Sequence, residues 1–544
     1  MTQTTDYSPA PAIRAHLFKH LSETHQFDLA IIGGGATGLG IALDAASRGL
    51  SVALFESEDF AKGTSSRSTK LVHGGVRYLA QGNISLVHEA LHERATILRN
   101  APHLAQPLSF LMPCYRYWEI PFYGAGLIMY DALAGKRGLG RTKFLGPQTT
   151  RQELGNIQTH GLKGSVQYWD GQFDDARLSI ALARTAARHG ALLINYCKVI
   201  DLIHTAGKVS GLHAEDTETG NRYTVNAGCV INATGVWVDA IRQLDQQNSG
   251  RRTEEIIAPS QGVHVVVDKK FLPSDHAMII PHTTDGRVLF AVPWLGKVIL
   301  GTTDTPRHDL SREPEPFKEE LEFILNESGR YLASAPKRED ILSIWVGLRP
   351  LVKPSSEDGQ NTKKISREHT VLISPSNLVT VTGGKWTTYR AMAQDALSHC
   401  CQANLLPEAN SSLTEDLALV GALKHQNVSH PMTQAPGLLA YGDEADFVQS
   451  LPGADHELGG GLTESMVRFA ARYEYARTAE DILARRSRLL FLDAKLAESM
   501  AETVGKILES ETSIDPKVKA FQTLALHYQH LPEDESRPQL ETSA

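Results

Sequence analysis

The sequence lacks the cysteine patterns that would indicate a disulfide framework or a zinc site. Its 544 residues include only five cysteines, and no two of them form a C-x-x-C pair. Few cysteines without such spacing are typical of a protein in a reducing compartment, and we expect no metal site. The cysteines should serve as small apolar side chains in or near cores. The five are Cys114, Cys197, Cys229, Cys400 and Cys401.

Long apolar runs and an excess of basic charge are also missing. The longest apolar stretch, near 122–133, is too short to span a bilayer, so any membrane contact should be at the surface. The first 26 residues contain Pro9, Pro11 and scattered charges but no apolar signal core, which predicts a loose tail. A formal net charge of −8 argues against a nucleic-acid partner but allows a local cationic pocket.

The stretch from 27 to 56 has the pattern of a dinucleotide-binding unit. An apolar run leads into Gly33, Gly34, Gly35 and Gly38, a small-residue helical segment follows, and a second apolar run ends on Glu56. In such a unit the glycines let the backbone approach a pyrophosphate at a helix N-terminus. An acid about 20 residues further on can accept hydrogen bonds from ribose hydroxyls. The motif itself does not distinguish NAD from FAD.

A polar segment over 62–70, followed by LVHGGVRYL, comes directly after the second apolar run. It can bury little apolar area by itself, so we expect it to wrap the cofactor, although an ordinary surface loop is the alternative. The residues that it would supply to the cofactor are Thr64, Ser65, Ser66, Ser68, Lys70, His73, Gly74 and Gly75.

Two further glycine turns lie far along the chain. An apolar run enters Ala233, Thr234 and Gly235, an arrangement found in flavoproteins with two dinucleotide-type elements, and this favours FAD over NAD. Another predicted strand, 377–382, enters the turn 383–385, which consists of Gly383, Gly384 and Lys385. A helix N-terminus or a lysine at this turn would stabilise the negative charge of a reduced flavin.

The remaining segments differ in composition. Region 256–350 alternates with the period of strands and predicts a mostly antiparallel sheet that forms a substrate domain. From about 406 onward the pattern is helical, with arginines on a solvated or interface face. In 101–170, the apolar residues of 118–133 precede a basic patch, which fits contact with anionic lipid or a packed helix with a solvated end. The patch consists of Lys136, Arg137, Arg141 and Lys143.

These motifs together resemble the FAD-dependent glycerol-3-phosphate dehydrogenases of the bacterial respiratory type. The stretches IGGGATGLGIALDAASRG (32–49), STKLVHGGVRYL (68–79) and GGKWTTYRAMA (383–393) carry the resemblance. GTTD (301–304), VGLRPL (346–351) and ARTAEDILARRSRL (476–489) fit as well. The likeness extends from about 27 to 530, with Leu39 bulkier than expected in the first glycine turn.

The resemblance implies an α/β (α+β) flavoprotein with a Rossmann-like FAD domain and a glycine-oxidase-like antiparallel substrate domain. A helical C-terminal domain completes it. The expected limits are 1–26 for the tail, 27–100, 171–245 and 345–405 for the FAD domain, 101–170 and 246–344 for the substrate domain, and 406–544 for the C-terminal domain.

It also implies oxidation of sn-glycerol 3-phosphate to dihydroxyacetone phosphate, with electrons passing from FAD to a membrane quinone. The protein would then be cytoplasmic or peripheral on the cytoplasmic face of the inner membrane. A homodimer is compatible with the resemblance. The alternatives are a glycerol-3-phosphate oxidase that uses O₂, an amine oxidase of the same fold, an NAD dehydrogenase, and a flavin-binding RNA-modifying or regulatory protein.

The substrate requires cations for its phosphate and a base for its C2 hydroxyl. Arg77 and Arg349 lie in matching motifs, and the planar guanidinium suits bidentate phosphate binding. Lys385 would hold phosphate or the reduced flavin, and Tyr78 would contribute a hydroxyl or an aromatic wall. We choose His264 as the base because its ordinary pKa lies near neutrality. His73 is the competing choice, and Thr302, Thr303 and Asp304 would shape the pocket.

Overall fold

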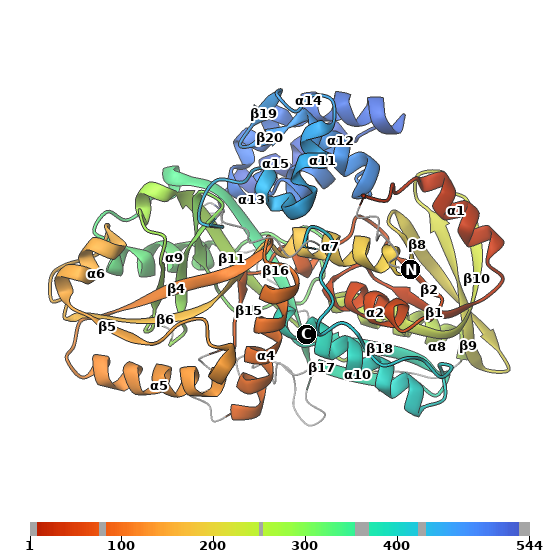
Figure 1. Ribbon diagram of the computed structural model, residues 1–544, viewed down its shortest axis with the longest axis horizontal. Coiled ribbons are helices and arrows are strands. Elements are labelled where there is room, and N and C mark those ends of the chain that lie inside the picture. Colours follow the sequence, from red (N-terminus) through yellow and green to blue (C-terminus); the bar gives the residue numbers. More distant parts are fainter. Residues whose placement is uncertain are drawn as a thin grey trace, which may run out of the picture.

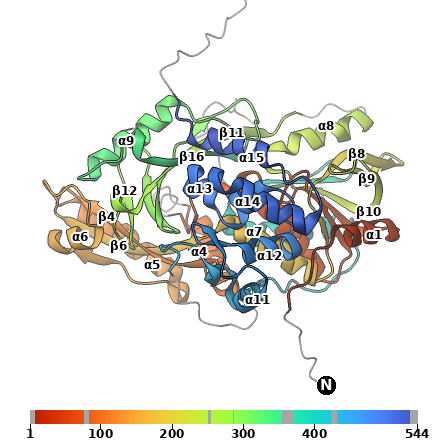
Figure 2. The ribbon, with the colours of Figure 1, turned by 90° about the horizontal axis from the view of Figure 1, so that it is seen from above.

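The computed structural model describes residues 8–75, 83–249, 254–284, 286–353, 369–422 and 431–532. Figure 1 shows three regions: a sheet with flanking helices on the right, a larger sheet on the left, and a group of helices above both. Seen from above in Figure 2, the C-terminal helices lie over the place where the two sheets meet.

The first sheet has a parallel core built around the predicted dinucleotide unit. Its strand order is β18, β10, β1, β2, β7, and all these neighbours run parallel. The apolar runs bury these strands between helices, and Leu29 and Ile31 have no exposed surface. The bounds are β1 (Phe27–Ile32), β2 (Val52–Phe55), β7 (Leu192–Ile194), β10 (Arg222–Asn232), β18 (Leu378–Gly383), α2 (Ala36–Ser47), α7 (Asp175–Arg188), α8 (Val238–Ser249) and α10 (Tyr389–Gln402).

Antiparallel strands extend this sheet. β17 (His369–Ile373) pairs with β18, and the hairpin of β8 (Cys197–Thr205) and β9 (Lys208–Asp216) joins the long strand β10. The strand–turn–helix–strand unit expected from the sequence is thus present, and the Rossmann-like part of the predicted fold is confirmed.

The second sheet has ten strands and is antiparallel except where β12 runs parallel to β4. The predicted antiparallel substrate sheet is therefore confirmed. Its strands are β3 (Leu71–Val72), β4 (Ala105–Cys114), β5 (Lys143–Leu145), β6 (Gly164–Phe173), β11 (Ile257–Asp268), β12 (Ala277–Ile280), β13 (Leu289–Trp294), β14 (Lys297–Gly301), β15 (Thr305–Pro306) and β16 (Ile341–Val352). The associated helices are α4 (Ile84–Asn100), α5 (Glu119–Ala134), α6 (Pro147–Leu154) and α9 (Lys318–Tyr331).

One expected domain limit differs from the structure. The sequence placed 345 at the start of the last FAD-domain segment, but β16 pairs with β11 as far as Val352 opposite Ile257. Because this strand is a full member of the second sheet, we propose that the limit lies after Val352.

The C-terminal helices do not form a core of their own. A single apolar cluster joins them to the second sheet and includes Trp294 and Trp345 from the sheet and Phe491 from the helices. Their bounds are α11 (Ala445–Ser450), α12 (Glu464–Tyr473), α13 (Leu489–Leu492), α14 (Ala494–Thr512) and α15 (Val518–Gln529), with a π-helical turn over Asp481–Arg486 and a short hairpin of β19 (Glu457–Gly459) and β20 (Leu462–Thr463).

The N-terminal segment is more ordered than the sequence suggested. Residues 14–23, expected in a loose tail, form α1 (Arg14–Glu23), whose Leu21 is buried. Arg14 pairs with Asp216 of β9, and the Ala12 backbone N–H donates to the carbonyl of Arg472. The ion pair and this backbone bond fix the segment in a way that its composition did not reveal.

Helix α5 (Glu119–Ala134) is packed against the protein along one edge and exposed along the other. One edge is buried through Leu127, Tyr130 and Ala134, as expected for a packed helix. Trp118, Phe122, Ile128 and Met129 are nevertheless exposed. No helix in the described part of the chain is both long and apolar enough to cross a bilayer.

Candidate functional site

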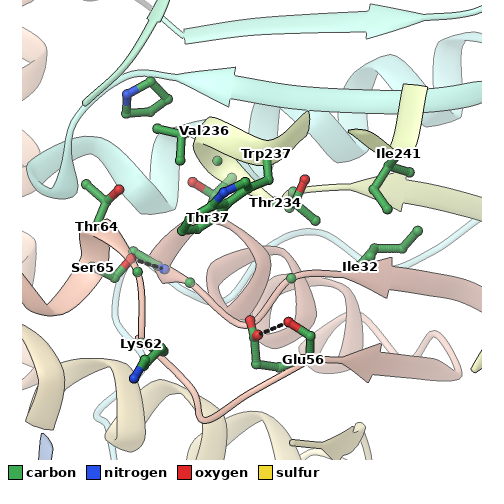
Figure 3. Close-up of a pocket in the computed structure, with 18 of the residues that line it drawn as sticks. Ile32, Thr37, Glu56, Lys62, Thr64, Ser65, Thr234, Val236, Trp237 and Ile241 are labelled. Atoms are coloured by element: carbon green, nitrogen blue, oxygen red, sulfur yellow. Dashed lines mark hydrogen bonds between the residues drawn. The ribbon is translucent and has the colours of Figure 1, made fainter. Parts of the chain in front are cut away.

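A cavity of about 490 Å³ lies where the parallel strands of the first sheet end (Figure 3). The three glycine turns, which follow β1, β10 and β18, all contribute to its wall. Carboxyl ends of parallel strands meet at one edge of the sheet, which is where open α/β folds bind their ligands. The predicted cofactor residues that line the cavity are Gly33, Gly35, Glu56, Thr64, Ser65, Ala233, Thr234, Gly235, Gly383, Gly384 and Lys385.

The first two glycine turns are in direct contact. Gly33 has a φ of +108°, and a Cβ added there would lie 2.7 Å from the carbonyl oxygen of Ala233. A Cβ on Gly38 would lie 1.9 Å from the carbonyl oxygen of Gly33. Side chains at either position would therefore separate the turn from the helix or from the second turn.

Glu56 is held at the edge of this cavity. Its carboxylate accepts hydrogen bonds from the backbone N–H of Gly34 at 2.7 Å and of Glu58 at 3.0 Å. Burial raises the pKa of Glu56, while these two backbone bonds act in the opposite direction. The fixed carboxyl group is suited to accept hydrogen bonds from ribose hydroxyls.

The segment 64–66 connects the cavity to both sheets. The Ala36 backbone N–H at the start of α2 donates to Ser65 Oγ at 2.9 Å, and the Trp386 indole donates to the carbonyl of Ser65 at 2.8 Å. Thr64 Oγ1 donates to the carbonyl of Leu348 in β16 at 2.6 Å. The loop therefore wraps the cavity, as the sequence predicted for its first residues.

The other predicted cofactor residues lie outside the lining of the cavity. Ser68 Oγ and the Lys70 ammonium group both donate to Asp175 Oδ2 at 2.7 Å. The backbone N–H of His73 donates to Thr387 Oγ1 at 3.3 Å, and that of Gly74 donates to the hydroxyl of Tyr130 at 2.8 Å. The full set is Gly34, Gly38, Ser66, Ser68, Lys70, His73, Gly74 and Gly75.

The sequence reasoning missed several residues of the cavity wall. Trp237 lines it, and the guanidinium of Arg312 lies 3.9 Å from the centroid of the indole ring. Lys62 and Lys198 also line it. Trp237 follows the second glycine turn by two residues, which was the available signal, whereas Arg312 comes from the substrate-domain loop and carried none.

His264 lies on β11 and is 2% exposed. Its Nε2 is 2.9 Å from Thr69 Oγ1, and its ring stacks on Trp345 with centroids 4.1 Å apart. Burial, and then the charges of Lys70 and Arg349, hold the pKa of His264 well below 6.5. The imidazole is therefore neutral near pH 7, and its pKa is lower than the near-neutral value for which the sequence favoured this residue as the base.

Arg349 lies on β16, on the same face of the sheet as His264. In the β11–β16 register His264 is opposite Trp345, and Arg349 is four residues further along β16. The guanidinium donates to the carbonyls of Gln261 at 3.1 Å and Thr303 at 3.0 Å. The next residue, Pro350, lines the cavity, whereas Arg349 and His264 are not among the residues that line it.

Glycine at position 262 leaves room for the guanidinium of Arg349. A Cβ there would lie 2.4 Å from its Nη2 atom. Arg349 Nη1 also lies 3.5 Å from Asp304, and its Nη2 lies 3.5 Å from Thr302 Oγ1. The GTTD and VGLRPL motifs thus meet at one place. Arg77 and Tyr78 lie outside the described residues.

Comparison with known proteins identifies the family. The profile described as FAD dependent oxidoreductase matches residues 28–395, and that of the C-terminal domain of alpha-glycerophosphate oxidase matches residues 412–519. The mitochondrial glycerol-3-phosphate dehydrogenase of Bos taurus is 40% identical over 535 residues, which cover 92% of this chain and 72% of that protein. The chain belongs to the FAD-dependent glycerol-3-phosphate dehydrogenase family.

Solved structures agree with this assignment. The glycerol-3-phosphate dehydrogenase of Bacillus halodurans, solved with FAD, has a TM-score of 0.75 and 29% identity over 96% of this chain and 99% of that one. A glycine oxidase from Geobacillus kaustophilus shares the fold, with a TM-score of 0.51 and 20% identity over 73% of this chain and 99% of that one. The predicted glycine-oxidase-like fold is therefore confirmed.

FAD is the cofactor of this family, and the cavity fits it. Glycine turns at the carboxyl ends of β1, β10 and β18 allow close approach of a pyrophosphate, and the half-buried Glu56 carboxyl group suits a ribose.

Proposed function

We propose that this dehydrogenase oxidises sn-glycerol 3-phosphate to dihydroxyacetone phosphate and delivers the electrons to a membrane quinone. The observation that carries the proposal is the placement of His264 and Arg349 on one face of the second sheet, whose strand β16 also supplies Pro350 to the wall of the glycine-lined cavity. A base and a phosphate-binding cation are the two groups that a phosphorylated secondary alcohol requires.

His264 acts as the base in this proposal. Its neutral imidazole accepts the proton of the C2 hydroxyl, and Thr69 and Trp345 orient the ring. Bound FAD supplies the acceptor for the hydride that leaves C2. The buried surroundings exclude bulk water from the imidazole, so the proton transfer takes place between fixed partners.

Arg349 binds the substrate phosphate. Two backbone carbonyls fix the direction of its guanidinium group, which reduces the conformational entropy lost on binding. Lys385, in the third glycine turn, adds a second positive charge at the cavity wall. Arg77 and Tyr78, carried by a motif of the family, complete the proposed substrate site.

Anaerobic mixing with sn-glycerol 3-phosphate tests the reaction. The flavin absorbance near the visible maximum should bleach, and a soluble quinone analogue should restore it. Admission of air instead should restore it slowly with little peroxide. A flavin that stays oxidised contradicts the proposed substrate, whereas fast reoxidation by oxygen with stoichiometric peroxide favours the oxidase alternative.

We also propose that α5 rests on the membrane surface. Its exposed side presents Phe122, Ile128 and Met129, the exposed Trp118 directly precedes it, and Phe144 of β5 is exposed beside it, 53% accessible. A Cβ on Gly124 of α5 would lie 2.3 Å from the Phe144 ring, so helix and strand form one apolar surface. In Figure 1 α5 lies at the edge of the molecule away from the C-terminal helices.

Basic residues follow this surface directly along the chain. Lys136, Arg137, Arg141 and Lys143 are exposed, and such charges attract anionic headgroups while aromatic and aliphatic side chains enter the acyl boundary. A surface-bound enzyme would thereby come within reach of a quinone that is confined to the bilayer.

A further inference from the structure

Lys70 is a fully buried lysine whose ammonium group is held at fixed distances. Its Nζ atom donates to Asp175 Oδ2 at 2.7 Å and to the carbonyl of Ser66 at 2.7 Å. The same atom lies 4.6 Å from the ring centroid of Trp345, within the range of a cation–π contact. None of these contacts is explained by cofactor binding, because Lys70 does not line the cavity.

Residues 69 and 70 both act on His264. Thr69 Oγ1 is 2.9 Å from the Nε2 atom of the imidazole. Lys70 contacts Trp345, and the Trp345 indole stacks on the His264 ring with an interplanar angle of 18°. This two-residue segment therefore supplies the hydrogen-bond partner of the proposed base and contacts its stacking partner.

The C-terminal helices fix the segment. Arg488, 1% exposed, donates from Nη2 to the carbonyl of Ser66 at 2.8 Å and to Asp175 Oδ1 at 3.0 Å. Asp175 also accepts from the backbone N–H of Ser68 at 3.0 Å. A single buried carboxylate thus joins the C-terminal region to the segment that contacts His264.

Neighbouring charged groups shift the pKa values of both Lys70 and His264. Burial lowers the pKa of Lys70 to about 7, Asp175 and Asp174 oppose that shift, and Arg488 adds to it. On the imidazole side, Lys70 and Arg349 both disfavour protonation of His264. Because the pKa of His264 lies below 6.5, Lys70 carries its proton over the pH range in which the imidazole titrates.

We propose that Lys70 is a positioning residue for His264: its ammonium group, fixed by Asp175 and Arg488, contacts the Trp345 indole on which the imidazole stacks and adds to burial in keeping the imidazole neutral. The inference rests on the proposed role of His264 as the base. It assigns a function to the C-terminal region, whose Arg488 completes the network.

The pH dependence of flavin reduction in single turnovers with the holoenzyme tests the charge of Lys70. In Lys70→Met the acid limb of the rate profile should move to higher pH by about one unit, because a nearby like charge has been removed. Lys70→Arg keeps a cation and should keep the wild-type limb. The inference would be overturned if the acid limbs of the pH–rate profiles coincided for Lys70→Met and wild type. It would also be overturned if Lys70→Met and Lys70→Arg moved the acid limb by the same amount.

The role of Arg488 is tested with a control arginine that also joins the C-terminal region to the first sheet region but lies outside the network of Lys70, Asp175 and Arg488. Arg477 pairs with Glu218 of the first sheet region at 2.7 Å and serves as the control. Arg488→Met should lower the rate of flavin reduction at least tenfold at unchanged FAD content, Arg488→Lys should recover part of it, and Arg477→Met should match wild type. Equal rates in Arg488→Met and Arg477→Met contradict the proposal.

His264→Asn distinguishes a failure of the proposed base from a failure of the role proposed for Lys70. If this variant reduces flavin at the wild-type rate, the proposed base is wrong and the inference fails with it. If it is inactive while Lys70→Met shows an unshifted limb, the inference alone fails and the proposed function stands.

Discussion

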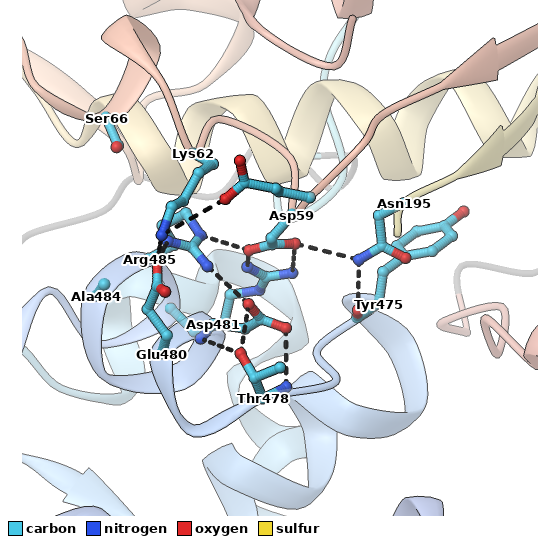
Figure 4. Close-up of polar contacts among 12 residues, drawn as sticks. Asp59, Lys62, Ser66, Asn195, Tyr475, Thr478, Glu480, Asp481, Ala484 and Arg485 are labelled. Carbon is cyan, nitrogen blue, oxygen red and sulfur yellow. Dashed lines mark hydrogen bonds and ion pairs between the residues drawn. The ribbon is translucent and has the colours of Figure 1, made fainter. Parts of the chain in front are cut away.

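The guanidinium of Arg486 and the carboxylate of Asp59 form a two-point ion pair inside the protein, 1% and 0% exposed. Arg485 contacts the same carboxylate and also pairs with Glu480 and Asp481 (Figure 4). These arginines were expected on a solvated or interface face, and they are at an interface that is fully buried. They join the C-terminal helices to the segment that follows Glu56, which wraps the cavity.

Removal of the Asp59 charge should destabilise this interface. Asp59→Asn leaves Arg485 and Arg486 without their common carboxylate, which costs about 3–5 kcal/mol for a buried pair. Chemical denaturation measures the loss. Glu23→Gln, which breaks an exposed pair with Lys19, should change the stability by less than about 0.5 kcal/mol. Equal effects in the two variants would contradict the buried pair.

The same carboxylate gives the stability a defined pH dependence. Burial alone would raise the pKa of Asp59, but Arg486 and Arg485 outweigh burial and hold it below 3.8. The unfolded state therefore binds a proton first as the pH falls, so this contribution is complete above about pH 4 and is lost below it. Denaturation midpoints between pH 5 and 3 should fall more steeply for wild type than for Asp59→Asn.

Substitution of the proposed base should depress catalysis without loss of cofactor. His264→Asn preserves a polar side chain of similar reach but cannot accept the proton, and general-base removal typically costs about 10²–10⁴-fold in rate. The measurements are kcat and the flavin content per chain. Wild-type turnover would remove His264 as the base and favour His73.

Loss of the proposed phosphate-binding side chain at position 349 should appear chiefly in substrate binding. Arg349→Ala should raise KM and weaken inhibition by inorganic phosphate, and Arg349→Lys should recover only part of the binding because an ammonium group lacks the bidentate fork. Arg330 of α9, an exposed arginine that pairs with Glu327, provides a substrate-domain control. Unchanged KM and unchanged phosphate inhibition in Arg349→Ala would exclude it as a phosphate ligand.

The first glycine turn should tolerate no side chain. Gly33→Ala places a Cβ 2.7 Å from the Ala233 carbonyl at a φ of +108°, so the purified protein should contain little or no FAD. Gly126 in α5 has open space around it, and Gly126→Ala should retain wild-type flavin content. The ratio of flavin to protein absorbance checks both variants.

The apolar side of α5 should control membrane binding. Phe122→Glu places a charge on this surface and should reduce sedimentation with vesicles that contain anionic lipid. Leu526→Glu, at an exposed leucine of α15, should not. Turnover with a water-soluble acceptor should be equal in both variants, since neither residue contacts the proposed site. Equal vesicle binding of Phe122→Glu and wild type would contradict the proposed contact.

Features encoded locally were predictable from the sequence. The glycine spacing after an apolar run, the acid at position 56 and the antiparallel pattern of the substrate region each depend on neighbouring residues, and all appear in the fold. The choice of Lys70 as a cofactor residue rested on its place in a polar segment. That segment is present, but the lysine turns toward Asp175, more than a hundred residues away in the chain.

The sequence by itself determined the glycine turns and the two kinds of sheet, because turn residues and side-chain periodicity specify backbone conformation over short distances. The resemblance of its motifs to a known family indicated the family and FAD. Tertiary structure alone decided which buried charges meet. The pairs Asp59–Arg486, Lys70–Asp175 and Arg488–Asp175 form between segments brought together by sheet closure and apolar packing, and no local pattern marks a charged residue as buried before its partner is in place.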